Sequence, residues 1–193
     1  MSFLDTIIAA DQELLIYLNN FGSEPYDQFW LIITKPLNWI PLFLFWLFLL
    51  IKNYKWQKGL FLFLFICAMA GLSDVLVNII KYSTARPRPC WQEGVLEQIR
   101  ILKCSGSFSF VSGHATTSTA VTTFMYLLFR KKYRWSILFY IYPLLFAYSR
   151  IYMGKHYPVD ILCGYTLGII EAILYLKLAH YILSKWKDKR KLA

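Results

Sequence analysis

Long apolar stretches separated by short polar loops dominate the chain. A membrane helix needs about 20 apolar residues to cross a hydrocarbon layer about 30 Å thick. The chain contains five stretches near that length, at about 29–51, 59–80, 111–129, 135–149 and 158–183. The fourth is short and contains Pro143, which membrane helices tolerate where neighbours satisfy the freed carbonyl. The pattern therefore predicts an all-α, polytopic transmembrane helical bundle.

The segment before the first stretch has a different pattern. From Ser2 to Phe21, the acidic residues Asp5, Asp11 and Glu13 interrupt a set of apolar positions. This spacing predicts an amphipathic helix lying in the membrane interface. The segment has no basic start and no unbroken apolar core, so it does not resemble a signal peptide. The alternative is a sixth span, which makes the expected number of spans five to six.

Composition excludes an ordinary soluble domain, because 58% of the residues are hydrophobic and 19% are aromatic. No repeat, low-complexity tract or linker divides the chain. We therefore expect a single membrane-embedded domain over residues 1–193.

The net charge of +10 reflects basic residues that gather beside the apolar stretches. The three basic clusters are Lys52, Lys55 and Lys58; Arg130, Lys131, Lys132 and Arg134; and Lys185, Lys187, Lys189, Arg190 and Lys191. By the positive-inside rule, these clusters and the C-terminus are cytoplasmic, and the loops 81–110 and 150–157 face outwards. In a bacterium this predicts the inner (plasma) membrane, with those loops facing the periplasm. Basic residues in such loops record membrane topology, so we expect no nucleic-acid partner.

Two of the four cysteines share the outer loop. Cys90 and Cys104 can form a disulfide that closes a loop of about 15 residues and contributes about 3 kcal/mol, or they can remain free thiols in a reducing host. Cys67 and Cys163 fall inside apolar stretches, where a thiol usually packs as a small apolar side chain.

Three clusters of polar residues lie at the outer ends of the apolar stretches, where an ionisable residue is a functional candidate. They are Lys81 to Pro89; Ser112, Gly113 and His114; and Ser149 and Arg150 followed by His156 and Asp160. The topology inferred from loop charges places all three clusters on one face of the membrane. They can therefore form one site.

This set of residues suits a phosphate group. Arg88 and Arg150 can hold phosphate oxygens through a planar fork, and Lys81 can do so as a point charge. Backbone N–H groups near Ser112 and Gly113 can add to this, because the start of a helix leaves its first N–H groups free.

Two histidines supply the chemistry that hydrolysis needs. Asp160 follows His156 by four residues, so on a helix beginning near Pro158 its carboxylate can fix the imidazole tautomer and leave the other nitrogen free to attack phosphorus. His114 remains as the general acid.

The three clusters resemble the signature of the type 2 phosphatidic acid phosphatase superfamily, in its membrane branch. The matching blocks are Lys81-x6-Arg88-Pro89, Ser112-Gly113-His114 and Ser149-Arg150-x5-His156-x3-Asp160, and together they run from residue 81 to 160. One departure is Val111, where the second block often begins with proline; we expect this to affect loop rigidity more than catalysis.

The resemblance implies a role for each matching residue. His156 is the nucleophile, Asp160 its orienting partner and His114 the general acid, while the phosphoryl group is held by Lys81, Arg88, Ser112, Gly113 and Arg150. It implies a lipid phosphatase that works through a phosphohistidine, without a metal or another cofactor.

The implied partners are the membrane and a lipid phosphate substrate. Undecaprenyl pyrophosphate, lipid A phosphate, phosphatidylglycerol phosphate and phosphatidic acid all fit, and the first two are favoured in a bacterium because they present phosphate on the outer side. The sequence carries no signal for an oligomeric state. The competing functions are a vanadium-dependent haloperoxidase, which shares this anion cradle, and a lipid-binding or transporting protein that does not turn over.

Six further charged residues outside the signature also need an interpretation. Arg86, Arg100, Lys103 and Lys155 are interpreted as side chains that reach to lipid headgroups. Asp74 either supports Lys81 or makes a polar contact between helices, and Glu171 poses the same question without a partner that the sequence identifies.

Overall fold

The chain folds as an assembly of helices in a computed structural model that describes residues 3–189. The helices are α1 (Phe3–Asn20), α2 (Asp27–Ile33), α3 (Ile40–Thr84), α4 (Gly113–Phe129), α5 (Ile141–Tyr152) and α6 (Pro158–Lys189). Short 3-10 turns join them: η1 (Glu24–Tyr26), η2 (Pro36–Trp39), η3 (Pro89–Trp91), η4 (Leu96–Gln98) and η5 (Arg134–Tyr140). The part of the chain that the structure describes contains no strand, which confirms the all-α part of the predicted fold class.

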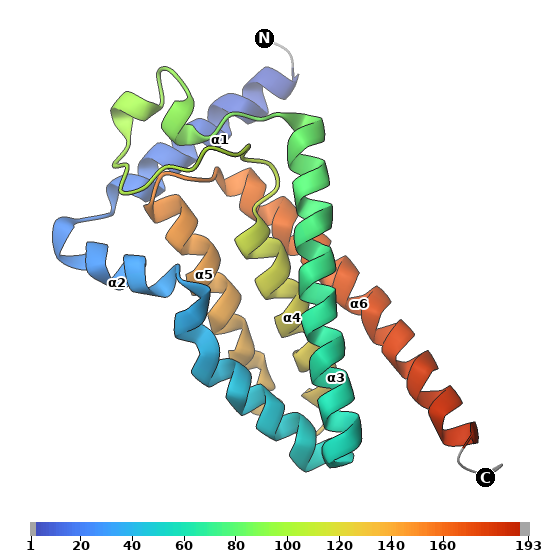
Figure 1. Ribbon diagram of the computed structural model, residues 1–193. Coiled ribbons are helices and arrows are strands. Elements are labelled where there is room, and N and C mark those ends of the chain that lie inside the picture. The colour runs from blue at the N-terminus through green and yellow to red at the C-terminus, as the bar shows by residue number, and fades with distance from the viewer. Residues whose placement is uncertain (1–2, 190–193) are drawn as a thin grey trace.

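Helix α3 is bent sharply into two arms. Lys55, with φ of 64° and ψ of 157°, interrupts its helical geometry, and the arms diverge from this bend as a V (Figure 1). Close to the bend the arms touch at Gly59, where an added Cβ would lie 2.7 Å from the Cα of Ile51. A glycine is needed at this contact because the backbones approach too closely for any side chain.

The first predicted span is wrong as one continuous helix. Residues 29–51 comprise most of α2, the turn η2 and the beginning of α3. The chain turns at Pro36, which lacks the N–H that would continue a helix. The fourth predicted span, 135–149, also differs, because its first half is the 3-10 turn η5 and its second half belongs to α5.

Helix α4 lies at the centre of the bundle, surrounded by α3, α5 and α6 (Figure 1). Its closest neighbour is α6, where two glycines remove the side chains that would hold the helices apart. A Cβ on Gly168 would meet the carbonyl oxygen of Thr116 and lie 2.9 Å from the backbone nitrogen of Ala120. A Cβ on Gly164 would lie 2.9 Å from the Cβ of Ala115. Close packing by small residues is typical of helices in membranes.

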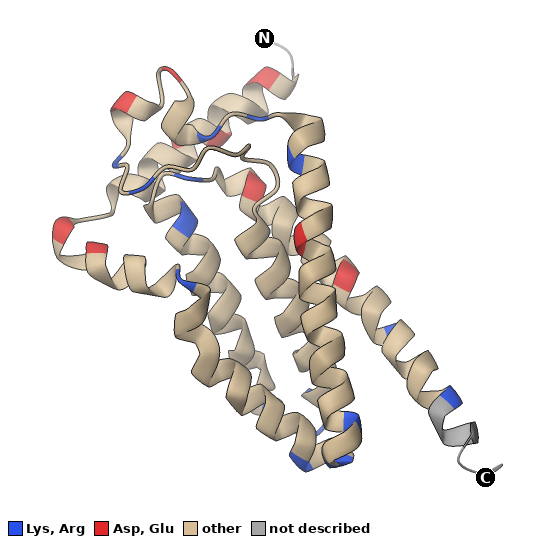
Figure 2. Ribbon diagram, viewed as in Figure 1, with Lys and Arg blue, Asp and Glu red and all other residues tan. Residues whose placement is uncertain are grey.

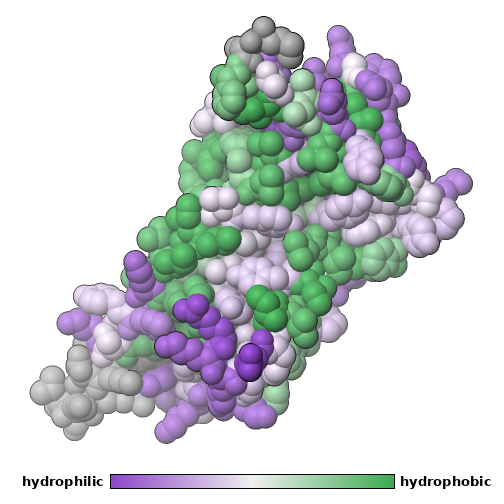
Figure 3. Space-filling view, turned by 180° about the vertical axis from the view of Figure 1, so that it is seen from behind, coloured by the Kyte–Doolittle hydropathy of each residue, from purple (hydrophilic) through white to green (hydrophobic). Residues whose placement is uncertain are grey.

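Charge and hydropathy divide the molecule into a broad apolar middle and two polar ends. Lys and Arg residues lie near the bend of α3 at one end, and most Asp and Glu residues lie towards the other (Figure 2). Hydrophobic side chains cover much of the surface between these ends (Figure 3). By length and composition, two helical stretches qualify as membrane spans, Pro36–Trp91 and Pro158–Lys185.

Helix α1 lies across the end of the bundle opposite the bend of α3 (Figure 1). Its inner stripe is Asp11, Leu15 and Asn19, which are all buried. The amide nitrogen of Asn19 donates to the carbonyls of Ile151 (2.9 Å) and Tyr152 (3.0 Å), which fixes the helix to the end of α5. Its exposed side chains are largely apolar and include Phe3, Leu4, Ile7, Ile8, Leu14 and Tyr17. Residues Phe3–Asn20 are helical, and the position of this helix in the membrane interface stays a prediction. Ser2, Arg190 and Lys191 lie outside the described residues.

The loop between α3 and α4 carries a disulfide between Cys90 and Cys104, the first of the two alternatives. The loop returns across the top of α3 and α4, and the bond ties its early part to its late part. Among the described residues, Cys67 and Cys163 are free thiols. Cys67 is exposed, so it does not pack inside the bundle as predicted.

We predict that Gly168→Ala lowers the midpoint of thermal unfolding in detergent, because the new methyl group must force α4 and α6 apart. Overpacking of this kind costs about 1–3 kcal/mol. Gly71→Ala is the matched control, since a Cβ at Gly71 on α3 would meet nothing within 4 Å. Alanine is favoured over glycine in a helix by about 1 kcal/mol, so this variant should unfold at the wild-type temperature or above it. Equal midpoints for the two variants would contradict the assigned packing.

Candidate active site

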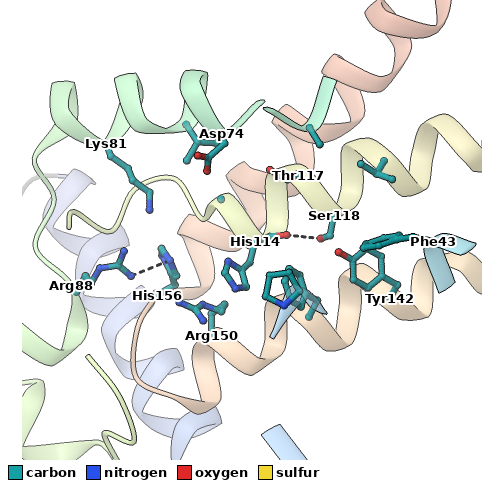
Figure 4. A pocket seen from close by; sticks show the side chains of 16 residues that line it. Phe43, Asp74, Lys81, Arg88, His114, Thr117, Ser118, Tyr142, Arg150 and His156 are labelled. Carbon is teal, nitrogen blue, oxygen red and sulfur yellow. Dashed lines mark hydrogen bonds between the residues drawn. The ribbon is translucent and has the colours of Figure 1, made fainter. Parts of the chain in front are cut away.

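The three polar clusters meet around one cavity at the same end of the bundle as α1. The cavity has a volume of about 520 Å³ and lies between α3, α4 and α5. One part of its wall carries charged and polar side chains that point into it, and another part is apolar (Figure 4). The predicted site residues in its wall are Lys81, Arg88, Gly113, His114, Arg150 and His156. Ser112 and Asp160 lie directly behind this wall.

Arg88 is the most completely held of the cations. Its Nε donates to the carbonyl of Ser107 (2.5 Å), and one terminal nitrogen donates to the hydroxyl of the same residue (2.8 Å). Its other terminal nitrogen donates to the carbonyl of Lys155 (3.0 Å) and lies 3.2 Å from Nε2 of His156. These four contacts, to the loop between α3 and α4 and to the loop between α5 and α6, fix the direction in which this guanidinium faces the cavity.

Arg150 and Lys81 retain capacity for an anion. A terminal nitrogen of Arg150 donates to the hydroxyl of Thr34 (2.7 Å), but its buried Nε has no partner. Lys81 is buried in the last turn of α3 and points into the cavity (Figure 4). A buried donor without a partner costs free energy, so a negatively charged ligand would be stabilised here.

The beginning of α4 forms another part of the wall. Ser112 caps the helix, with its hydroxyl accepting from the backbone nitrogen of Ala115 (3.4 Å). Its own N–H donates to the carbonyl of Asp160 (3.1 Å) and is therefore not free for a phosphate oxygen. Gly113 does line the cavity. The predicted anion site at this helix start thus rests on Gly113 and the helix dipole more than on Ser112.

His114 follows on the next position of α4 and reaches across the cavity. Its ring stacks on Phe146 of α5, with centroids 4.3 Å apart and an interplanar angle of 15°. The ring lies near His156 and Arg150 in the same wall (Figure 4). This places an imidazole beside the position that a phosphate would occupy.

His156 has its two nitrogens in different environments. Nδ1 lies 3.4 Å from Oδ2 of Asp160, and Nε2 lies 3.2 Å from a terminal nitrogen of Arg88. Arginine can only donate, so Nε2 must accept and the proton must be on Nδ1, facing the carboxylate. The unshared pair of Nε2 consequently points towards the cavity and its cations.

Asp160 is fully buried and is held by groups from several segments. Oδ2 accepts from the backbone nitrogen of Tyr157 (2.9 Å) and from the hydroxyl of Ser109, and Oδ1 accepts from Arg86 (2.7 Å). The i, i+4 contact with His156 that the sequence predicted is present. The carboxylate is therefore fixed in position independently of the histidine that it orients.

Burial lowers the pKa of His156 to about 3, and the nearby cations Arg88 and Arg150 act in the same direction. Asp160 opposes them but does not reverse the effect. A lowered pKa disfavours the imidazolium form. The ring is therefore neutral near pH 7, as a nucleophile must be.

Several residues at this end of the bundle were missed or misinterpreted from sequence. Arg86 bridges Asp160 and Asp11, both at 2.7 Å, and does not reach to headgroups. Lys155 is also buried, and this desolvation, with the cations nearby, lowers its pKa to about 8. Arg100 pairs with Asp27 at 3.0 Å. The repeated Arg-Pro of residues 86–89 was the available signal for Arg86.

Two further ambiguities are resolved by the structure. Asp74 lines the cavity together with Lys81 and accepts from the amide of Asn78 (3.3 Å), so it belongs to the site and not to a distant helix contact. Glu171 is buried on α6 and does not line the cavity, and among the described residues one of its carboxyl oxygens has no hydrogen-bond partner.

Comparison with known proteins decides the family. The PAP2 superfamily profile matches residues 61–184, which is more than half of the chain. The chain belongs to the PAP2 superfamily. This confirms the resemblance that the three blocks predicted, and the PAP2 match includes every residue of those blocks.

Relatives extend the similarity beyond the PAP2 match. A lipid A 4'-phosphatase of Bacteroides thetaiotaomicron is 29% identical over 180 residues, covering 91% of this chain and 79% of its own length. An undecaprenyl-diphosphatase of Sulfolobus acidocaldarius is 30% identical over 163 residues, covering 83% and 67%. The crystal structure of a PAP2-type phosphatidylglycerolphosphate phosphatase from Bacillus subtilis shares the fold, with a TM-score of 0.70 at 21% identity, covering 92% and 88% of the two chains.

We predict that His156 stays neutral well below the ordinary histidine pKa of about 6.5. Nuclear magnetic resonance of the detergent-solubilised protein with ¹⁵N-labelled histidine would follow the ring nitrogens from pH 8 to pH 4. The His156→Ala spectrum assigns the signal. We expect it to keep the chemical shifts of a neutral ring with Nδ1 protonated throughout this range, whereas a transition near pH 6.5 would contradict the described environment.

Proposed function

We propose that this chain is an integral membrane phosphatase that hydrolyses a lipid phosphate through a covalent intermediate on His156. The observation that carries the proposal is the orientation of this ring, with Nδ1 bound to Asp160 and Nε2 facing a cavity lined by Lys81, Arg88 and Arg150. The same activity on lipid phosphates or diphosphates is named for the relatives described above.

In the first step, the phosphoryl oxygens bind Lys81, Arg88, Arg150 and the start of α4 at Gly113, in the helix that Ser112 caps. When Arg88 turns its donor to the phosphate, the unshared pair of His156 Nε2 is released for attack. A bond forms between Nε2 and phosphorus while the bond from phosphorus to the lipid oxygen breaks. His114, which takes up a proton when the anionic phosphate binds beside it, donates that proton to the leaving oxygen.

In the second step, water attacks the phosphohistidine. His114, now neutral, accepts a proton from the water as the bond between phosphorus and Nε2 breaks. Inorganic phosphate leaves and both histidines return to their starting state. Throughout, Asp160 stabilises the positive charge that develops on His156, and the cations stabilise the equatorial oxygens. No step uses a metal or another cofactor.

The apolar part of the cavity supports a lipid substrate. Phe43, Val121 and Phe146 line the same cavity as the cations. A second apolar cavity of about 140 Å³ shares Phe43 and Val121 with the first and continues between the arms of α3 towards Leu50. A phosphate at the cations would therefore have an apolar path for the attached chain, inside the bilayer.

The arrangement in the membrane is part of the proposal. We assign five spans, with α1 lying in the interface at the end that holds the site, and a single domain over residues 1–193. The basic residues near the bend of α3 lie at the opposite end from the site (Figure 2). The positive-inside rule then places the site at the periplasmic or outer face of the bacterial plasma membrane, with the C-terminus in the cytoplasm.

Among lipid phosphates we propose a lipid A phosphate as the preferred substrate. The support is the lipid A 4'-phosphatase relative, with which the similarity covers 91% of this chain. Undecaprenyl diphosphate is the next candidate, on the basis of the second relative.

The test is phosphate release by the purified protein from lipid A, undecaprenyl diphosphate, phosphatidylglycerol phosphate and phosphatidic acid, in EDTA. We expect release by the wild type, fastest from lipid A, and a loss of at least about a thousandfold in His156→Ala, because removing a nucleophile leaves only binding and electrostatic effects. Acid-labile ³²P on the wild-type protein, absent from His156→Ala, would identify the intermediate.

The outcomes separate the parts of the proposal. Release that depends on a divalent metal would overturn the metal-free scheme, and equal release by His156→Ala would overturn the assigned nucleophile. If folded wild-type protein releases phosphate from none of the four lipids, the lipid phosphatase proposal fails for these substrates.

A further inference from the structure

Arg86 lies between two buried carboxylates that come from opposite ends of the chain. One terminal nitrogen lies 2.7 Å from Oδ1 of Asp160 and the other lies 2.7 Å from Oδ2 of Asp11. The side chains of Asp160 and Asp11 are exposed by 0% and 2%. Because both pairs are shielded from water, they are screened less than surface ion pairs.

The two carboxylate oxygens of Asp160 have different partners. Oδ2 faces His156, Ser109 and the backbone of Tyr157, whereas Oδ1 is held by Arg86. A planar carboxylate is oriented when both oxygens are fixed, so Arg86 sets the plane in which Oδ2 meets Nδ1 of His156. The guanidinium thus acts on the nucleophile through Asp160, without touching the substrate.

Arg86 is itself held in place. Its guanidinium lies 4.0 Å from the centroid of the Tyr157 ring, which keeps it flat against the segment that carries His156. Asp11 is fixed by a second bond, since its Oδ1 accepts from the backbone nitrogen of Val159 (2.9 Å). Asp11 therefore contacts both Arg86 and the first turn of α6.

Asp11 occupies an unusual position for a carboxylate. It lies on the buried stripe of α1, one turn from Leu15, while the other face of the helix exposes apolar side chains. Burying a charge is costly unless it is paired and hydrogen-bonded. An apolar residue would pack at this position without that requirement, so the position calls for an explanation beyond helix packing.

We infer that Arg86 and Asp11 are positioning residues for Asp160, and that α1 is consequently a working part of the active site. The inference rests on the proposed function, in which Asp160 orients His156. It adds a segment outside the PAP2 match, since Asp11 lies far before residue 61.

The charges of the two residues predict opposite effects on the site. Arg86 is a cation beside Asp160. Removing it makes the surroundings of His156 more negative, which favours the protonated form of the ring. Removing the charge of Asp11 has the reverse effect, because Arg86 is then less neutralised. The other charged or titratable groups that act on His156 or Asp160 are Lys81, Arg88, His114, Arg150, Tyr157 and Cys163.

The experiment compares Arg86→Gln, Arg86→Lys and Asp11→Asn with Glu13→Gln, a matched control that removes an exposed charge from the same helix. With the best lipid substrate, we expect kcat to fall by about tenfold to a hundredfold in Arg86→Gln and less in Asp11→Asn. This is the range found when the hydrogen-bond partners that orient metal-binding side chains are removed. KM should change less than about twofold, and Glu13→Gln should match the wild type.

The pH dependence separates positioning from a general loss of structure. The acid limb of kcat/KM should move to higher pH in Arg86→Gln and to lower pH in Asp11→Asn, while Arg86→Lys should keep the wild-type limb at a reduced kcat. The ¹⁵N signal of His156 should show the same opposite displacements. Arg86→Gln combined with Asp11→Asn should be no slower than Arg86→Gln alone.

Wild-type kcat in folded Arg86→Gln and Asp11→Asn would overturn the inference and leave the proposed function intact. Displacement of the acid limb in the same direction in both variants would also overturn it. If the wild type turns over no lipid, the proposed function fails, and the opposite displacements of the His156 signal still test the arrangement around Asp160.

Discussion

The active-site end of the molecule depends on satisfying one buried carboxylate. Asp160 has no access to water, and an unpaired charge in such a place would cost several kcal/mol. Its partners come from the loop before α6 and from both ends of the loop between α3 and α4, where Arg86 follows α3 and Ser109 precedes α4. Its backbone carbonyl also accepts from Ser112 at the start of α4. The loops that carry Arg88 and His156 and the start of α4 are thereby tied to one residue.

On the other side of His156, which faces the cavity, buried cations are not fully paired. There, Lys81 and Arg150 are buried among other cations, and the buried Nε of Arg150 has no partner. Like charges held together in a site of low dielectric repel one another, and a phosphate group relieves this repulsion. The site is therefore organised before the substrate arrives, with donors already directed at the position of the phosphoryl oxygens. Such preorganisation is the main source of catalysis in phosphoryl transfer.

The helices place these two environments at one end of an apolar body. The bend of α3 separates its arms, and the cavity between these arms, α4 and α5 continues from the cations into apolar surroundings. The disulfide of Cys90 and Cys104 closes the loop whose later residues, Ser107 and Ser109, hold Arg88 and Asp160. A membrane protein thus exposes its charges at the ends, where water is near, and its apolar helices between them.

Much of this was determined by the sequence alone. Hydropathy predicted the helical membrane fold, loop charges predicted that the three polar clusters share a face, and the spacing of His156 and Asp160 predicted their contact, because these are local or periodic properties. The break at Pro36, the bend at Lys55 and the partners of Arg86 were decided by tertiary structure. Arg86 could not be distinguished from a residue that reaches to headgroups, since its role depends on Asp11 and Asp160, 75 and 74 positions away. Sequence patterns report the environment along a helix, whereas the pairing of buried charges depends on which helices meet in space.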